Sequence, residues 1–131
     1  MSRFVETSIP GGIVVEPTVH RDERGFLFES YHEPRYREGG VDARFVQDNH
    51  SRSSRGTLRG LHYQIECPQG NLVRVTQGEV FDVAVDLRRA SPSFGQWTSM
   101  ILNEDNKYMV WIPPGFAHGL YVLSATPEFQ Y

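Results

Sequence analysis

The stretch Val80-Phe81-Asp82-Val83-Ala84-Val85-Asp86-Leu87 decides the fold class, because it has the clearest period-two pattern in the chain. Such alternation predicts a β-strand. Asp82 and Asp86 stand four residues apart and therefore share one face of that strand. From this segment alone, the favoured interpretation is the solvated face of an outer strand. A barrel with a polar interior would reverse that interpretation.

Outward from this strand, short runs with strand character alternate with Gly- and Pro-containing turns throughout the chain. The predicted strands cover residues 13–15, 25–30, 45–50, 58–64, 71–76, 80–87, 97–102, 108–112 and 120–123. Many short strands separated by such turns indicate an antiparallel sandwich or barrel. The one helical candidate is short and covers residues 34–38.

The composition describes a single domain that can bury a hydrophobic core without disulfides. The 131 residues carry a net charge of −3, so no overall basic field favours nucleic acid or a membrane as partner. Lys107 is the only lysine, and arginine suits the bidentate binding of phosphate or carboxylate. Cys67 is the only cysteine, which fits a reducing compartment. With no signal peptide or apolar span predicted, we expect a cytoplasmic protein.

The segment FVQDNHSRSSRGTLRGLHYQ, residues 45–64, concentrates polar chemistry in a region of strand character. It contains two histidines, three arginines and an amide-rich triplet: His50, His62, Arg52, Arg55, Arg59, Gln47, Asp48 and Asn49. On a straight strand Arg59 and His62, three residues apart, would face opposite ways. Gly60 between them predicts a bulge that brings both side chains to one side.

A metal site is not predicted by the spacing of the histidines. Metal ligands are usually closely spaced, whereas His50 and His62 stand twelve residues apart, and Gln64 occupies the position two after His62. His20 and His32 lie in polar, loop-like surroundings and are expected to be exposed. His118 follows an apolar strand and a Pro-Pro-Gly turn, so it is either a hydrogen-bonded core residue or a site residue. We expect a site without metal or other cofactor.

Proton transfer is the chemistry that these side chains can perform. His62 can act as a general base near neutral pH, and an arginine can hold an anionic part of the substrate. A tyrosine could return the proton from another direction. The candidates are Tyr63, Tyr121 and Tyr131, and Tyr63 should point away from its neighbour His62.

Four long segments resemble the dTDP-4-dehydrorhamnose 3,5-epimerase family, in order and over nearly the whole chain. They are RGFLFES (residues 24–30), FVQDNHSRSSRGTLRGLHYQ (45–64), LVRVTQGEVFDVAVDLRRASPSFGQW (72–97) and WIPPGFAHGLYVLS (111–124). The resemblance implies an all-β, cupin-type double-stranded β-helix, or jelly roll, with short N-terminal strands and little helix. It implies one such domain over residues 1–131 that lacks the C-terminal part of the family domain. It also implies a homodimer that needs no metal.

The resemblance implies epimerisation of dTDP-4-dehydro-6-deoxy-D-glucose at both carbons beside its ketone, giving dTDP-4-dehydro-L-rhamnose. His62 matches the family's proton acceptor and Tyr131 its proton donor. Eight further residues match substrate-binding positions. They are Arg24, Glu29, Gln47, Asp48, Asn49, Arg59, Asn71 and His118. Among these, Arg59 matches a phosphate ligand, and Arg24 and Glu29 match residues that reach the nucleotide across the dimer interface.

The chain departs from the family pattern at two places. Asn71 stands where the family usually has a lysine, so a neutral amide replaces a cation beside the developing enolate oxygen. The family also continues beyond the tyrosine, with an aspartate that orients the basic histidine and an aromatic that stacks on thymine. Asp82 and Asp86 are the candidates within this chain to replace that aspartate.

Three alternatives to a 3,5-epimerase remain open. A protein that binds the dTDP-sugar without turnover is suggested by Asn71 and by the absent segment. A metal-dependent cupin such as a dioxygenase is suggested only by the fold and three histidines. Relatives in deoxysugar pathways act at one carbon or move the ketone, and the sequence does not separate these reactions from 3,5-epimerisation.

Overall fold

The computed structural model describes residues 2–65, 68–125 and 127–131. It contains twelve strands and one short helix within these ranges. The strands are β1 (Arg3–Glu6), β2 (Ile13–Glu16), β3 (His20–Asp22), β4 (Gly25–Leu27), β5 (His50–Arg52), β6 (Leu58–His62), β7 (Asn71–Gln77), β8 (Glu79–Asp86), β9 (Trp97–Asn103), β10 (Met109–Ile112), β11 (Phe116–Val122) and β12 (Glu128–Gln130). The helix α1 spans Glu33–Glu38.

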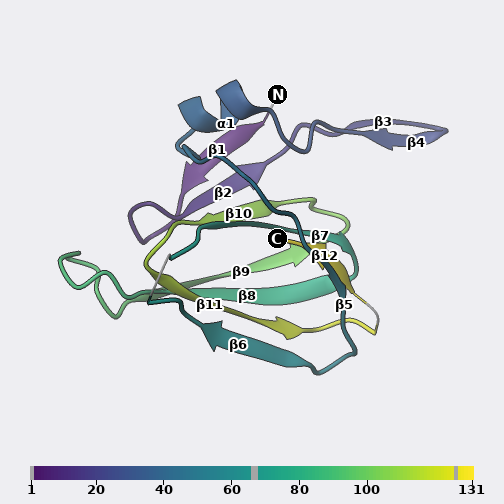
Figure 1. Cartoon of the computed structure of the whole chain (residues 1–131). Coiled ribbons are helices and arrows are strands. Elements are labelled where there is room, and N and C mark those ends of the chain that lie inside the picture. Colours follow the sequence, from purple (N-terminus) through teal and green to yellow (C-terminus); the bar gives the residue numbers. More distant parts are fainter. Residues whose placement is uncertain (1, 66–67, 126) are drawn as a thin grey trace.

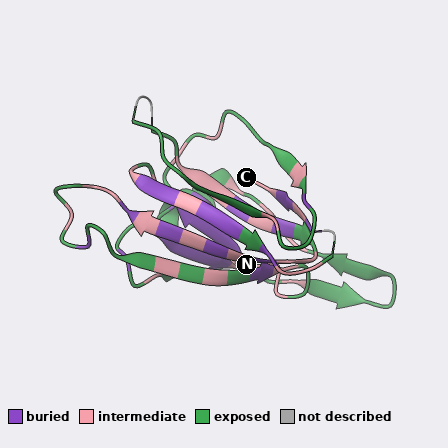
Figure 2. Cartoon of the chain, turned by 90° about the horizontal axis from the view of Figure 1, so that it is seen from below, coloured by how far each residue is buried: buried purple, intermediate pink, exposed green. Residues whose placement is uncertain are grey.

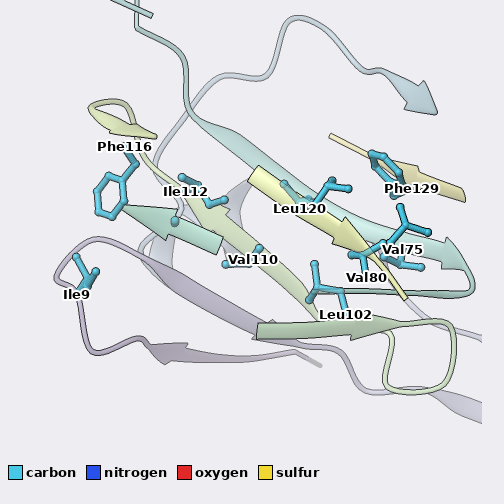
Figure 3. Close-up of a cluster of buried hydrophobic side chains, with 12 residues drawn as sticks. Ile9, Val75, Val80, Leu102, Val110, Ile112, Phe116, Leu120 and Phe129 are labelled. Atoms are coloured by element: carbon cyan, nitrogen blue, oxygen red, sulfur yellow. The ribbon is translucent and has the colours of Figure 1, made fainter. Parts of the chain in front are cut away.

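Two sheets face each other and enclose the main core (Figure 1). The six-stranded sheet has the order β1-β2-β10-β7-β12-β5, and the four-stranded sheet has the order β6-β11-β8-β9. All neighbouring strands within the two sheets run antiparallel. Val75 and Phe129 from the first sheet meet Val80, Leu102 and Leu120 from the second (Figure 3). The predicted all-β sandwich is therefore confirmed.

A second, smaller cluster lies on the outer side of the six-stranded sheet. Tyr36 from α1 packs with Val15, Met109 and Trp111, and it is fully buried. Burial raises the pKa of the Tyr36 phenol to about 12. The predicted short helix is confirmed, and it seals this end of the sheet.

The strands β3 and β4 form a two-stranded hairpin that projects away from the body of the molecule (Figure 1). Every residue of both strands is exposed, as Figure 2 also shows. Phe26 and Leu27 leave 55% and 72% of their surface uncovered. Two neighbouring large apolar side chains so exposed are typical of a segment that contacts another molecule.

The favoured interpretation of Asp82 and Asp86 was wrong. Residues 79–86 alternate between intermediate and buried, and both aspartates point into the sandwich, where each is at most 2% exposed. The strand lies inside the four-stranded sheet, between β11 and β9, so its inner face cannot reach water. The sequence showed that the two residues share a face but did not show which face.

Most predicted strands occur at the expected positions, with three differences. Residues 45–49 form no strand, although Asn49 exchanges two backbone hydrogen bonds with Tyr131. β11 begins at Phe116, four residues before its predicted start. β1, β3 and β12 are short strands that the sequence did not predict. Within the described residues, no helix is long and apolar enough to cross a membrane.

Candidate active site

A β-bulge at Gly60 brings Arg59 and His62 to one face of β6. His62 stands opposite His118 and Arg59 stands opposite Leu120, so β6 holds one residue more than β11 over this interval. Since His118 and Leu120 share the inner face of β11, their partners share it too. The predicted bulge is confirmed.

Gly60 is the residue that this bulge requires. Its φ of +101° is unfavourable for other residues, and an added Cβ would lie 2.6 Å from the carbonyl oxygen of His118. The close approach of the two backbones therefore depends on the missing side chain. It places His62 at the edge of the sheet, exposed, beside the buried end of β11.

His118 is held by the buried carboxylate of Asp82. The distance from Nε2 of His118 to Oδ2 of Asp82 is 2.7 Å, and the Asp82 side chain is 3% exposed. Burial raises the pKa of the Asp82 carboxyl, and the adjacent imidazole acts in the opposite direction. His118 is therefore hydrogen-bonded, as the first of its two predicted roles requires, and it stands opposite His62 on the neighbouring strand. Its role as a site residue stays a prediction.

The hypothesis that Asp82 or Asp86 orients His62 is wrong. Among the described residues Asp82 bonds to His118. Asp86 lies about 13 Å further along the strand, where Arg88, Ser91 and Ser93 bind it. No hydrogen bond joins His62 to a described side chain.

Tyr131 enters the same interior from the opposite sheet. It directly follows β12, its ring stacks on that of Phe129 with centroids 5.8 Å apart, and it packs against the main core. Its hydroxyl lies 3.3 Å from the Oγ of Ser51 on β5. The other tyrosine candidates, Tyr63 and Tyr121, are both exposed.

Two serines of β5 and its continuation connect these groups, and sequence reasoning missed both. Ser51 contacts Tyr131, while Ser53 accepts a hydrogen bond of 3.0 Å from Nε of Arg59. Ser53 is buried, and residues two apart on a strand share a face. The alternation of Ser with Arg in residues 50–53 was the pattern that could have revealed them.

Half of the predicted site residues line one cavity of ≈ 790 Å³. These are Gln47, Asp48, Asn49, Asn71 and Tyr131. Asn71 stands opposite Ile112 at the start of β7. The wall of this cavity also includes Arg74, whose pKa is lowered by burial, with nearby Tyr36 and Asp48 acting in the opposite direction. Arg59, His62 and His118 belong to the facing sheet and are not part of this wall.

Arg24 and Glu29 lie at or beside the projecting hairpin, away from the other predicted site residues. Arg24 forms an ion pair with Asp22 at 2.7 Å in the hairpin turn. Glu29 bonds to Arg35, and this hydrogen bond lowers the pKa of the Glu29 carboxyl. The structure of one chain does not bring these two residues to the cavity.

The described residues hold no group of three or more His, Cys, Asp or Glu that could bind a metal ion. Cys67 lies outside the described residues. The structure groups two imidazoles and an arginine on neighbouring strands of the four-stranded sheet, and a phenol with several amides on the wall of the cavity. These are groups that bind polar ligands and transfer protons.

Comparison with known proteins identifies the family of the chain. Residues 6–131 match the family model described as dTDP-4-dehydrorhamnose 3,5-epimerase. A protein of that name from Pseudomonas aeruginosa is 61% identical over 95% of this chain and 69% of its own length. One from Methanothermobacter thermautotrophicus is 54% identical over 93% of this chain and 66% of its own length. The chain thus spans about two thirds of the length of these relatives.

A solved structure of a similar protein supports the same family through its fold. The crystal structure of a dTDP-6-deoxy-D-glucose 3,5-epimerase from Legionella pneumophila, in complex with dTDP-4-keto-L-rhamnose, superposes with a TM-score of 0.95. It is 54% identical and covers 99% of this chain and 70% of its own chain. With the cupin-type jelly roll and the family model in agreement, the chain belongs to the dTDP-4-dehydrorhamnose 3,5-epimerases, a family of isomerases.

Proposed function

We propose that this chain inverts the two stereocentres beside the ketone of dTDP-4-dehydro-6-deoxy-D-glucose, with His62 as base and Tyr131 as acid. The observation that carries the proposal is that these two groups come from opposite sheets and face one interior. Inversion needs a base on one face of the carbon and an acid on the other. Two groups on a single strand could not meet that requirement.

The remaining residues support binding of a nucleotide sugar. Nε of Arg59 donates to Ser53, and its two terminal nitrogens make no hydrogen bond to a described side chain, so they are placed to bind an anion such as a diphosphate. The amides and carboxylate of Gln47, Asp48 and Asn49 line the same cavity as Tyr131, where they can hydrogen-bond to sugar hydroxyls and the base. The Legionella relative was solved with a dTDP-sugar bound.

We also propose that the chain forms a homodimer in which the hairpin β3–β4 reaches the partner's nucleotide. The exposed Phe26 and Leu27 give the hairpin an apolar surface, and Arg24 supplies a positive charge near its tip. Sedimentation equilibrium should show a dimer, and Leu27→Glu should weaken it. A monomer at all concentrations for the unmodified chain would refute this proposal.

Proton NMR in deuterated water tests the chemistry directly. With dTDP-4-dehydro-6-deoxy-D-glucose, the chain should replace the protons at both carbons beside the ketone with deuterium. His62→Asn should lower the exchange rate by about 10²- to 10⁴-fold. Tyr131→Phe should exchange protons without inverting the carbons, because the base still works while the acid is missing.

The matched control is Tyr121→Phe, which removes the same hydroxyl from an exposed position of β11. It should leave exchange and inversion unchanged. Exchange at only one carbon would assign the chain to the one-carbon epimerases. An unchanged exchange rate in His62→Asn would overturn the assignment of the base.

A second candidate, binding without turnover, is favoured by one observation. His62 makes no hydrogen bond to a described side chain, so within the described part of the chain nothing fixes its tautomer. This candidate predicts binding of dTDP with no isotope exchange. The same NMR experiment, combined with calorimetric titration of dTDP, separates the two functions.

A further inference from the structure

The buried carboxylate of Asp82 has no role in the proposed transfer between His62 and Tyr131. It is 3% exposed, and its hydrogen-bond partner is Nε2 of His118 at 2.7 Å. An isolated ionised carboxylate in such a position would be costly. Asp82 and His118 must therefore be considered together as one unit.

The second nitrogen of His118 is open to the interior. Nδ1 makes no hydrogen bond to a described residue, and the described residues contain no buried side-chain nitrogen or oxygen that lacks a partner. Nδ1 must therefore retain some contact with open space, in keeping with the 15% exposure of the side chain. It is available to a ligand.

Electroneutrality of the pair determines whether Nδ1 carries a hydrogen. If Asp82 is ionised and His118 is an imidazolium, both ring nitrogens carry one. If Asp82 is protonated, its hydrogen lies between Oδ2 and Nε2, and the neutral ring keeps its own hydrogen on Nδ1. Only an ionised Asp82 beside a neutral ring leaves Nδ1 bare, and this form places an uncompensated charge in the core.

The position of His118 indicates what this N–H would meet. His118 stands opposite His62 on the adjacent strand, which places their Cα atoms about 5 Å apart. The base acts on carbons that flank a ketone, so the ketone oxygen is two bonds from each reacting carbon. A donor next to the base is within reach of that oxygen.

We propose that Asp82 is a positioning residue that keeps a hydrogen on Nδ1 of His118, and that this N–H hydrogen-bonds to the ketone oxygen as the enolate forms. The proposal rests on the proposed function. As the C–H bond breaks, its proton goes to His62 and its electron pair is delocalised onto the ketone oxygen. Nδ1–H stabilises that charge without transferring a proton.

Nitrogen NMR of the protein labelled with ¹⁵N-histidine tests the first half without any turnover. At pH 7, Nδ1 of His118 should carry a directly bonded hydrogen, assigned by comparison with His118→Gln. In Asp82→Leu, which removes the carboxylate, that hydrogen should no longer be fixed on Nδ1. A bare Nδ1 in the unmodified protein would overturn the proposal.

Isotope exchange and nucleotide binding test the second half. Asp82→Leu should slow exchange on the order of a hundredfold, the loss expected for one oxyanion donor. Asp82→Asn, whose amide N–H can still donate to Nε2 and keep the hydrogen on Nδ1, should slow it much less. The affinity for dTDP should stay unchanged, because the nucleotide lies away from the reacting carbons. Asp105→Asn, in an exposed turn, is the control and should exchange at the unmodified rate.

The two variants also separate a chemical role from a structural one. Asp82→Val is smaller and also lacks a donor, so it carries the test if Asp82→Leu does not fold. Unmodified exchange in a folded Asp82→Leu or Asp82→Val variant would overturn the proposal. If the unmodified chain carries the hydrogen on Nδ1 and binds dTDP but exchanges nothing, the proposed function fails while the assignment of Asp82 stands.

Discussion

Asp82 and Asp86 occupy equivalent positions on the inner face of β8, yet their surroundings differ completely. Asp86 accepts hydrogen bonds from the guanidinium and backbone N–H of Arg88 and from the hydroxyls of Ser91 and Ser93. The bond from Arg88 is the largest of the causes that hold its pKa well below the usual range. Asp82 has His118 alone among the described residues, and burial raises its pKa.

This difference separates a structural end of the four-stranded sheet from a chemical end. At the structural end every carboxylate lone pair is satisfied by a fixed donor, so the charge is permanent and the loop after β8 is pinned. At the chemical end the Asp82 carboxyl is hydrogen-bonded to the His118 imidazole, whose second nitrogen has no hydrogen-bond partner among the described residues. Incomplete satisfaction is costly for stability and is typical of functional sites.

The largest expected effect comes from removing the cation at the structural end. Arg88→Met leaves Asp86 buried without its counter-charge, and it also removes the hydrogen bond to the carbonyl of Pro10 and the contact with Phe116. We expect a loss of about 3–5 kcal/mol in the free energy of unfolding, measured by urea denaturation. Arg89→Met, its exposed neighbour, is the control. Equal losses in the two variants would show that the Asp86 cluster is not a stabilising unit.

The next effect concerns the bulge at the chemical end. Gly60→Ala places a Cβ 2.6 Å from the carbonyl oxygen of His118 and strains a φ of +101°, so we expect it to cost about 3 kcal/mol. Gly56→Ala is the matched control, since its φ is +80° but its Cβ would meet nothing within 4 Å. The control should lose about 1–2 kcal/mol. If the losses of unfolding free energy in Gly60→Ala and Gly56→Ala differ by less than the error of the urea titration, the close approach of β6 and β11 is refuted.

The pH dependence of stability should have opposite signs for the two aspartates. Because the folded pKa of Asp86 is depressed, its contribution is present above the unfolded value of about 3.9 and is lost as the pH falls below it. Between pH 5 and pH 2.5 the unmodified chain should lose on the order of 2 kcal/mol that Asp86→Asn does not lose.

For Asp82 the folded pKa is raised, so its contribution is present below about pH 3.9 and is lost as the pH rises through the folded value. The stability difference between the unmodified chain and Asp82→Asn should therefore not grow from pH 2.5 to pH 5. Urea denaturation at both pH values checks this. If the unfolding free energies of Asp82→Asn and Asp86→Asn depend on pH in the same way, the distinction between the two ends of the sheet is refuted.

The comparison also shows how far the sequence could predict this molecule. The alternation in residues 80–87 placed both aspartates on one face, and the odd spacing of Arg59 and His62 around Gly60 predicted the bulge. Those inferences need only the geometry of one strand. The partners of Asp82 and of Tyr131 depend on which strand lies beside which, and local patterns carry no such information. For this reason His118 was not paired with Asp82, and Ser51 and Ser53 were missed.

The smallest expected effect tests whether a positive charge at residue 71 would speed the reaction. Asn71→Lys places an ammonium at the start of β7, on a residue that lines the cavity together with Tyr131. In the unmodified background we expect the rate of isotope exchange to rise about tenfold, which corresponds to 1.4 kcal/mol. Gln77→Lys adds the same charge at an exposed position of the same strand and should change nothing.

The double variant Asn71→Lys, Asp82→Leu makes this prediction sharper. If the N–H of His118 already stabilises the enolate oxygen, a lysine at residue 71 compensates for its loss, so the gain from lysine should be larger when Asp82 is changed. Two donors that act on one oxygen are coupled, and a double-mutant cycle measures that coupling. Additive effects would show that residue 71 and the Asp82–His118 pair act on different parts of the substrate.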